Sequence, residues 1–154
     1  MEETELPHYY FAYGSNLSLE QMQARCPDAR FFSVAHLSGY RLAFGGFSQT
    51  RGGGVATIRP DHKGGRTAGV LFEMTPDDWR KLDVYEGYPS IYRREVVQVF
   101  NPAGWPIQAQ VYIRNQFDAK APAPAYRRII EYGYKFHCLP IPQLQLALAE
   151  CQRA

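Results

Sequence analysis

The chain has 154 residues and a formal net charge of +2, and charged residues are spread along its length. This length favours a single domain, residues 1–154, that buries a core without a structural metal or disulfide. The absence of a basic block argues against nucleic-acid binding. No apolar run approaches the ~18 residues of a membrane-spanning helix, so we expect no membrane partner.

The cysteines and histidines show no metal-binding or disulfide pattern. The three cysteines lack a Cys-x-x-Cys spacing, and the four histidines lack the spacing of zinc ligands. The acidic N-terminus also lacks the charged and then apolar layout of a signal peptide. We therefore expect a reduced, cytoplasmic protein with no metal site.

The first predicted elements are a strand and a short helix. Residues 8–13 are rich in aromatic side chains and predict a β-strand. Ser18 is a good N-cap for a helix over 19–26, and Gln21 is placed to complete a capping box. Pro27 ends that helix, because a proline disfavours helical backbone in the residue before it.

Gly14, Ser15 and Asn16 separate this strand from this helix. Such a junction gathers backbone N–H groups that can bind an anion, either a phosphate or a carboxylate. Gly14 is expected to help by adopting a positive φ and by letting a ligand approach the backbone. An ordinary tight turn with a capped helix accounts for the same residues, and both interpretations stay open here.

The rest of the chain alternates predicted strands with three further helices. With residues 8–13 the strands number about seven, enough for a closed or nearly closed sheet. The segment Arg51–Gly54 leads into the strand expected at 54–60. It is either a second anion-binding loop or a flexible turn, and a turn is the more common role of a glycine run. The further strands are expected at 30–37, 40–45, 54–60, 67–74, 92–100 and 107–115, and the helices at 76–86, 123–136 and 141–151.

Glu86 is the candidate acid/base residue. In the helix capped by Thr75, it follows Trp79 and Leu82 at the i+7 and i+4 positions, which places its carboxylate on the apolar face. Burial and the negative end of the helix dipole both raise the pKa of a carboxyl group. A raised pKa suits general acid/base catalysis. The alternative is a helix that frays before Glu86 and leaves it in solvent.

Several motifs together resemble one known family, the gamma-glutamylcyclotransferases (the gamma-glutamylcyclotransferase-like, AIG2-like superfamily). They are YFAYGSNL, GGGVATIRP, GVLFEMTPDDWRKLDVYEGY and PAYRRIIEYGYKFHCLP, in this order, from about residue 10 to 140. The resemblance implies an α+β fold, with a mixed β-sheet curled into a small barrel of about six to seven strands and flanking helices.

The resemblance also implies a reaction and its site residues. The α-amine of a gamma-glutamyl compound attacks its own γ-carbonyl, giving pyroglutamate and a free amine, with Glu86 as the general acid/base. No metal or cofactor takes part. The residues expected to bind substrate are Tyr13, Gly14, Ser15, Asn16 and Leu17, which hold the α-carboxylate, together with Tyr92 and Tyr126 in the pocket wall.

Three questions stay open at this point. The leaving group is an amino acid, a peptide, an amine or part of a gamma-glutamylated natural product. A small-molecule binding module on the same fold, without turnover, is the alternative to an enzyme, although a carboxylate in an apolar pocket favours the enzyme. A homodimer is compatible with the high aromatic content, which comprises 22 Phe, Trp and Tyr residues.

Overall fold

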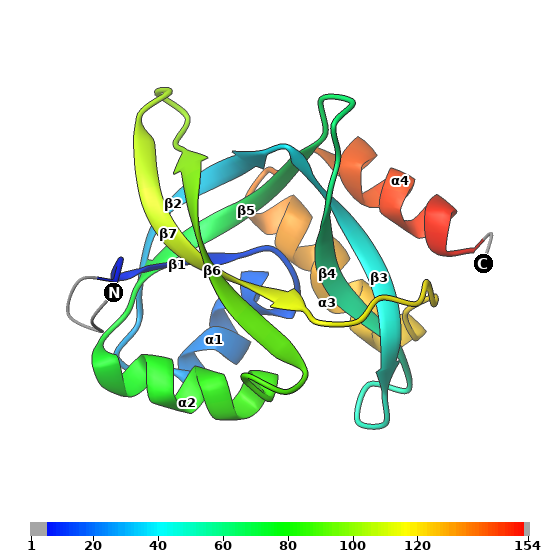
Figure 1. The fold of residues 1–154 in the computed structure, drawn as a ribbon, viewed down its shortest axis with the longest axis horizontal. Helices are drawn as coiled ribbons and strands as arrows, with labels where there is room; N and C mark the ends of the chain where they lie inside the picture. Colours follow the sequence, from blue (N-terminus) through cyan, green and yellow to red (C-terminus); the bar gives the residue numbers. More distant parts are fainter. Residues whose placement is uncertain (1–5, 153–154) are drawn as a thin grey trace.

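The computed structural model describes residues 6–152 and contains a barrel, a separate two-stranded ribbon and four α-helices (Figure 1). The α+β class expected from the sequence is confirmed, as is the number of strands. In chain order the elements are β1 (Tyr9–Ala12), the 3-10 turn η2 (Ser15–Leu17), α1 (Leu19–Arg25), β2 (Arg30–Ser38), β3 (Tyr40–Ser48), β4 (Gly53–Pro60), β5 (Arg66–Glu73), α2 (Pro76–Glu86), β6 (Tyr92–Phe100), β7 (Pro106–Arg114), α3 (Pro124–Phe136) and α4 (Ile141–Cys151).

Five strands close the barrel in the order β1-β5-β2-β6-β7. Their pairings are antiparallel except for the closing one, in which β1 runs parallel to β7 with Tyr10 opposite Gln110. Apolar and polar residues alternate along β7 from Ile107 to Arg114, a pattern typical of a strand with one buried and one polar face. The second half of β7 is instead buried on both faces, including Gln110 and Tyr112, because one face lies inside the closed barrel and neighbouring elements cover the other.

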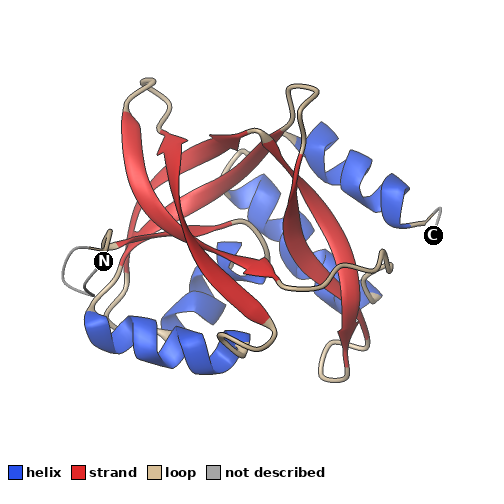
Figure 2. Ribbon diagram, viewed as in Figure 1, coloured by secondary structure: helices blue, strands red, loops and turns tan. Residues whose placement is uncertain are grey.

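β3 and β4 form a separate two-stranded sheet, and an isolated bridge joins Gly45 of β3 to Ala119. The barrel therefore has five strands rather than the six to seven expected (Figure 2). β3 and β4 continue the β2–β5 ribbon beyond a bend, where Ser38 pairs with Arg66 and Tyr40 with Pro60. At the bend Gly39 alone stands opposite residues 61–65. Its φ of +83° is one that glycine adopts readily, and the four extra residues on the facing side accompany the bend that takes the ribbon out of the barrel.

The helices cover the barrel and the ribbon on different sides. α1 and α2 lie side by side below the barrel in Figure 1, and α4 packs against β3. α3 lies against η2, where Gly133 is needed for the contact. A Cβ at that position would be 2.6 Å from the Cβ of Leu17, which is closer than two carbon atoms can approach.

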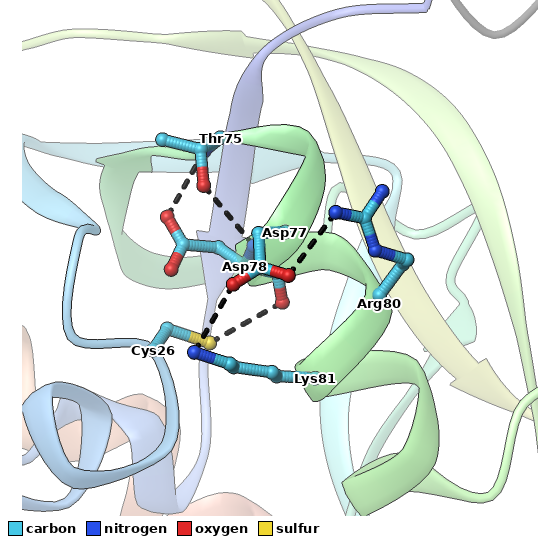
Figure 3. Close-up of polar contacts among 6 residues, drawn as sticks. All are labelled: Cys26, Thr75, Asp77, Asp78, Arg80 and Lys81. Carbon is cyan, nitrogen blue, oxygen red and sulfur yellow. Dashed lines mark hydrogen bonds and ion pairs between the residues drawn. The ribbon is translucent and has the colours of Figure 1, made fainter.

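α2 has well-defined ends, which fix the position of its last residue, Glu86. At its start Thr75 and Asp78 form a capping box, and Pro76 occupies the first turn (Figure 3). Asp77 forms exposed ion pairs within the helix, and the thiol of Cys26 contacts the Asp78 carbonyl at 3.5 Å. Gly87 ends the helix with a φ of +71°. The expected start and stop of this helix are therefore confirmed.

Candidate active site

A pocket of about 400 Å³ opens between one end of the barrel and the turn of the β3–β4 ribbon. Barrel, ribbon and helices all contribute to its wall. The lining residues are Tyr10, 13–16, 47–51, Val55, Ala56, Tyr85, Glu86, Ile91, Tyr92, Tyr112, Arg114 and Tyr126. The pocket thus contains all the expected site residues except Leu17.

The Gly14–Asn16 junction lines the pocket and presents unpaired N–H groups. Within residues 6–152, the backbone N–H groups of Gly14, Ser15 and Asn16 have no protein acceptor, whereas Leu17 N–H donates to the Gly14 carbonyl at 3.0 Å. Three adjacent free donors beside a helix start form an environment suited to an anion.

Gly14 is needed for a reason other than the one expected. Its φ is −120°, so it does not adopt the positive φ predicted from the sequence. A Cβ at this position would instead lie 2.9 Å from the Cβ of Ala56 and 3.7 Å from the Tyr126 hydroxyl oxygen. The missing side chain therefore lets β4 and α3 approach the loop and close the pocket around it.

Asn16 and Ser15 are held by neighbouring side chains. Asn16 is buried, its amide donates to the Tyr10 hydroxyl at 3.0 Å, and its Oδ1 accepts from Arg25. Arg25 also donates to Ser15 Oγ at 3.3 Å. These bonds use Asn16 Oδ1 and Ser15 Oγ as acceptors and one N–H of the Asn16 amide as a donor. The donors left for a ligand are the backbone N–H groups, the second N–H of the Asn16 amide and the Ser15 hydroxyl proton.

Leu17 does not line the pocket. Its side chain is buried in the core against α3, and its carbonyl lies 2.8 Å from Nε2 of His137. Because its N–H is also bonded within the loop, Leu17 has no group left for substrate. Its role is to anchor the loop to α3.

Glu86 lies at the C-terminal end of α2 and reaches the pocket with only part of its side chain accessible to solvent. Burial raises the pKa of its carboxyl group from 4.5 to about 7. The guanidinium groups of Arg25 and Arg51 oppose this rise, and the Asp83 carboxylate adds to it. The helix does not fray before Glu86, so the carboxyl is enclosed and near half-ionised at neutral pH.

Arg51 of the pocket wall and Arg25 of α1 share two hydrogen-bond acceptors, an arrangement that the sequence did not predict. Both guanidinium groups donate to Gln21 Oε1, at 2.9 and 3.1 Å, and both donate to the Tyr85 hydroxyl. Ser18 does cap α1, as expected, but the Gln21 side chain serves this pair rather than a capping box. In the described part of the chain neither arginine forms an ion pair with a carboxylate.

The glycine run after Arg51 has a packing role. Gly52 turns the chain with a φ of +74°. Gly54 donates its N–H to the Ala121 carbonyl at 2.9 Å, and a Cβ there would lie 2.0 Å from the Lys120 carbonyl oxygen. The run is therefore a turn packed against residues 120–123, and it brings Arg51 to the pocket.

Tyr92 and Tyr126 both line the pocket and both bind Ala56. The Tyr92 hydroxyl donates to the Ala56 carbonyl, and the Tyr126 hydroxyl accepts from the Ala56 N–H, each at 2.9 Å. Burial raises the pKa of Tyr126 to about 12 and that of Tyr92 further still. Both side chains are therefore neutral hydroxyls at physiological pH.

Residues 6–152 contain no group of three His, Cys, Asp or Glu side chains that could hold a metal ion. The helices within that range are all too short or too polar to cross a membrane. The three cysteines at 26, 138 and 151 are unpaired.

Comparisons with known proteins agree with this fold. Residues 10–134 match a family model described as gamma-glutamyl cyclotransferase, AIG2-like. The chain is 38% identical to a human gamma-glutamylcyclotransferase and 36% identical to a bovine one, in each case over 86% of this chain and 72% of the relative. A solved structure titled gamma-glutamyl cyclotransferase superposes with a TM-score of 0.83 at 35% identity, covering 90% of this chain and 85% of that one. The chain therefore belongs to the gamma-glutamyl cyclotransferase, AIG2-like family.

Proposed function

We propose that this chain is a gamma-glutamylcyclotransferase that uses Glu86 as its general acid/base. The Glu86 carboxylate takes a proton from the α-ammonium group of the substrate, and the freed amine attacks the γ-carbonyl carbon. The tetrahedral oxyanion then collapses, the amide C–N bond breaks, and Glu86 returns its proton to the leaving nitrogen. The attacking nitrogen loses its second proton to the departing amine, which leaves as an ammonium ion and gives a neutral lactam. The products are pyroglutamate and a free amine.

The observation that carries this proposal is the enclosed Glu86 carboxyl in the same pocket as three free backbone N–H groups. A pKa of about 7 lets one group both accept and donate a proton at neutral pH. We assign the α-carboxylate to the N–H groups of residues 14–16. Since the α-amine is on the same carbon, this places the amine where a base is required, and holding the chain folded lowers the entropic barrier.

We further propose that the leaving group carries a carboxylate, as in a gamma-glutamyl amino acid or peptide. Arg51 and Arg114 both line the pocket, and Arg25 contacts the pocket residues Ser15, Asn16 and Tyr85 without lining the pocket itself. Glu86 supplies at most one negative charge against the two guanidinium groups of the pocket wall. A substrate with two carboxylates complements this excess better than a gamma-glutamyl amine does.

The test is to incubate the protein with gamma-glutamyl amino acids, peptides and amines and to measure pyroglutamate. Glu86→Gln keeps the shape of the side chain and removes the base, so we expect turnover to disappear while the substrate still binds. Turnover in the Gln variant would disprove the role of Glu86. Binding without product in the wild-type protein would instead indicate the non-catalytic binding module.

A homodimer and a cytoplasmic setting remain proposals. The exposed aromatic side chains of Phe31, Tyr132 and Phe136 support the first, and the unpaired cysteines support the second. Light scattering of the purified protein would decide the oligomeric state, because a monomer mass at micromolar concentration would exclude a stable dimer.

A further inference from the structure

Tyr112 on β7 connects the two halves of the proposed site. Its side-chain hydroxyl donates to Asp83 Oδ1 at 2.6 Å, and its backbone carbonyl accepts from the Tyr13 hydroxyl at 2.5 Å. Asp83 precedes Glu86 by about one turn of α2, and Tyr13 immediately precedes Gly14. One buried residue therefore bonds both to the helix of the base and to the start of the anion loop.

Asp83 is itself fixed from several directions. Its carboxylate lies 3.6 Å from Nε of Arg94, and both side chains are largely shielded from solvent. The Arg94 guanidinium lies over the rings of Trp79 and Tyr88, at 5.1 and 4.8 Å. The Asp83 carbonyl also accepts the N–H of Tyr88, at 2.9 Å, just beyond the helix end. The last turn of α2 is thus anchored to the barrel through Asp83.

We propose that Tyr112 and Asp83 are positioning residues that set where the Glu86 carboxylate lies relative to the Gly14–Asn16 loop. The proposal rests on the proposed function, in which the α-carboxylate and the α-amine of the substrate share one carbon atom. The base must then lie at a fixed offset from the loop, and a displacement of about 1 Å can cost about 100-fold in rate. The Tyr112 hydrogen bond limits that displacement.

The two residues act differently on Glu86, which makes them separable. The Tyr112 hydroxyl contributes position, whereas the Asp83 carboxylate contributes position and a negative charge that raises the pKa of Glu86. Other titratable or charged groups also line the pocket or act electrostatically on Glu86. They are Tyr10 of β1, Tyr13 just after it, Arg25 and Cys26 at the end of α1, Arg51 of the ribbon, Tyr85 of α2, Tyr92 of β6, Arg114 of β7 and Tyr126 of α3.

The experiment compares kcat and KM of wild-type protein, Tyr112→Phe and Asp83→Asn between pH 5 and 9, with a gamma-glutamyl amino acid as substrate. Tyr112→Phe keeps the carbonyl that binds Tyr13, so we expect KM within about twofold of wild type while kcat falls about 10- to 100-fold. Asp83→Asn keeps an acceptor for Tyr112 but removes the charge. We therefore expect the acidic limb of its kcat profile to move to lower pH, with a plateau near that of wild type.

Two matched controls separate these effects from general damage. Tyr134→Phe removes a buried hydroxyl that has no hydrogen-bond partner among residues 6–152, and Tyr134 is outside the pocket. Asp77→Asn removes an exposed carboxylate from the same helix as Asp83. Both controls should keep wild-type kcat, KM and pH profile. Thermal unfolding of each variant identifies any that is not folded at the assay temperature.

Two results for Tyr112→Phe would overturn the proposal: an unchanged kcat, or a rise in KM that matches the loss of kcat. For Asp83→Asn, the proposal is overturned if the acidic limb of the kcat–pH profile stays at the wild-type pH. A wild-type protein that forms no pyroglutamate would count against the proposed function instead. In that case a 13C NMR titration of the Glu86 carboxyl decides. A lower pKa in Asp83→Asn, with no change in Asp77→Asn, supports the coupling of Asp83 to Glu86, and an unchanged pKa in Asp83→Asn overturns it.

Discussion

Tyr92 and Tyr126 bind opposite ends of the same residue, since one hydroxyl donates to the carbonyl of Ala56 and the other accepts from its N–H. As a result, the two hydroxyl groups offer a substrate different hydrogen-bonding roles. The proton of Tyr92 is used, which leaves its oxygen as an acceptor for substrate. The proton of Tyr126 is free, which makes that hydroxyl a donor.

Tyr126→Phe should therefore weaken both the fold and the activity. The buried N–H of Ala56 loses its acceptor, and leaving such a group unpaired costs about 1–3 kcal/mol. We expect this loss in the free energy of unfolding measured by urea titration, together with a lower kcat/KM. Tyr134→Phe is the matched control because its hydroxyl has no partner to lose in the described part of the chain, and equal destabilisation of both variants would contradict the role of the Ala56 bond.

Activity should depend on pH through Glu86. The base form is required to accept the proton of the α-ammonium group, and the pKa of the carboxyl is about 7. We expect kcat/KM to fall about tenfold for each pH unit below that value, because kcat/KM reports the groups of the free protein. The measurement is pyroglutamate formation at substrate concentrations well below KM. A kcat/KM that stayed constant down to pH 5 would exclude a base with this pKa.

Glu86→Gln should be more stable than the wild type at alkaline pH, although it is inactive. The folded pKa is above the unfolded value of 4.5, so between these values the folded state binds more protons than the unfolded state. Stability of the wild type therefore declines as pH rises from about 4.5 to 7. Allowing for solvent at the pocket mouth, we expect Glu86→Gln to gain about 1–3 kcal/mol at pH 8, and little below pH 4.5. Urea unfolding at both pH values checks this.

Arg51→Gln should change which leaving groups are accepted. We expect kcat/KM for gamma-glutamyl-alanine to fall about 10-fold or more, because a charge-assisted bond to a carboxylate contributes about 1.5–3 kcal/mol. The corresponding alaninamide, whose leaving group has no carboxylate, should be almost unaffected. Equal losses for both substrates would indicate that Arg51 does not contact the leaving group.

Gly14→Ala should damage the site through crowding. The added Cβ would lie 2.9 Å from the Ala56 Cβ, and accommodating it would cost about 1–3 kcal/mol and move β4 or the loop. We expect a large rise in KM and a lower unfolding temperature. Gly104→Ala is the control: it strains a turn with a φ of +85° in open space, so it should lower stability and leave KM unchanged.

Local patterns predicted the elements and the position of Glu86 well. Ser18, Thr75 and Gly87 act through their nearest neighbours, and the position of Glu86 on the apolar face of α2 follows from helical spacing alone. For Gly14 the sequence correctly indicated that a glycine is needed, but a positive φ was the wrong reason. The actual reason is the close contact with Ala56, and this residue lies on a strand more than forty residues later, where a local pattern cannot reveal it.

Tertiary contacts explain what the sequence did not reveal. Nothing near Arg25 distinguishes it from a solvated helix residue, and its role depends on Tyr85, which is sixty residues away. Tyr112 belongs to the polar half of an alternating strand pattern, and that pattern cannot show that one face of β7 lies inside a closed barrel while the other is covered by neighbouring elements. Leu17 follows the loop directly in sequence but faces the core, because the 3-10 turn rotates it toward α3.

The bend at Gly39 has a consequence for how this pocket can change over evolution. Because the ribbon leaves the barrel there, the base and the anion loop belong to one structural unit, and the turn from Phe47 to Arg51 belongs to another. Surface turns tolerate substitution and insertion at small cost in stability. Mutations in the ribbon tip can thus alter the choice of substrate while the reaction chemistry of the barrel is inherited unchanged.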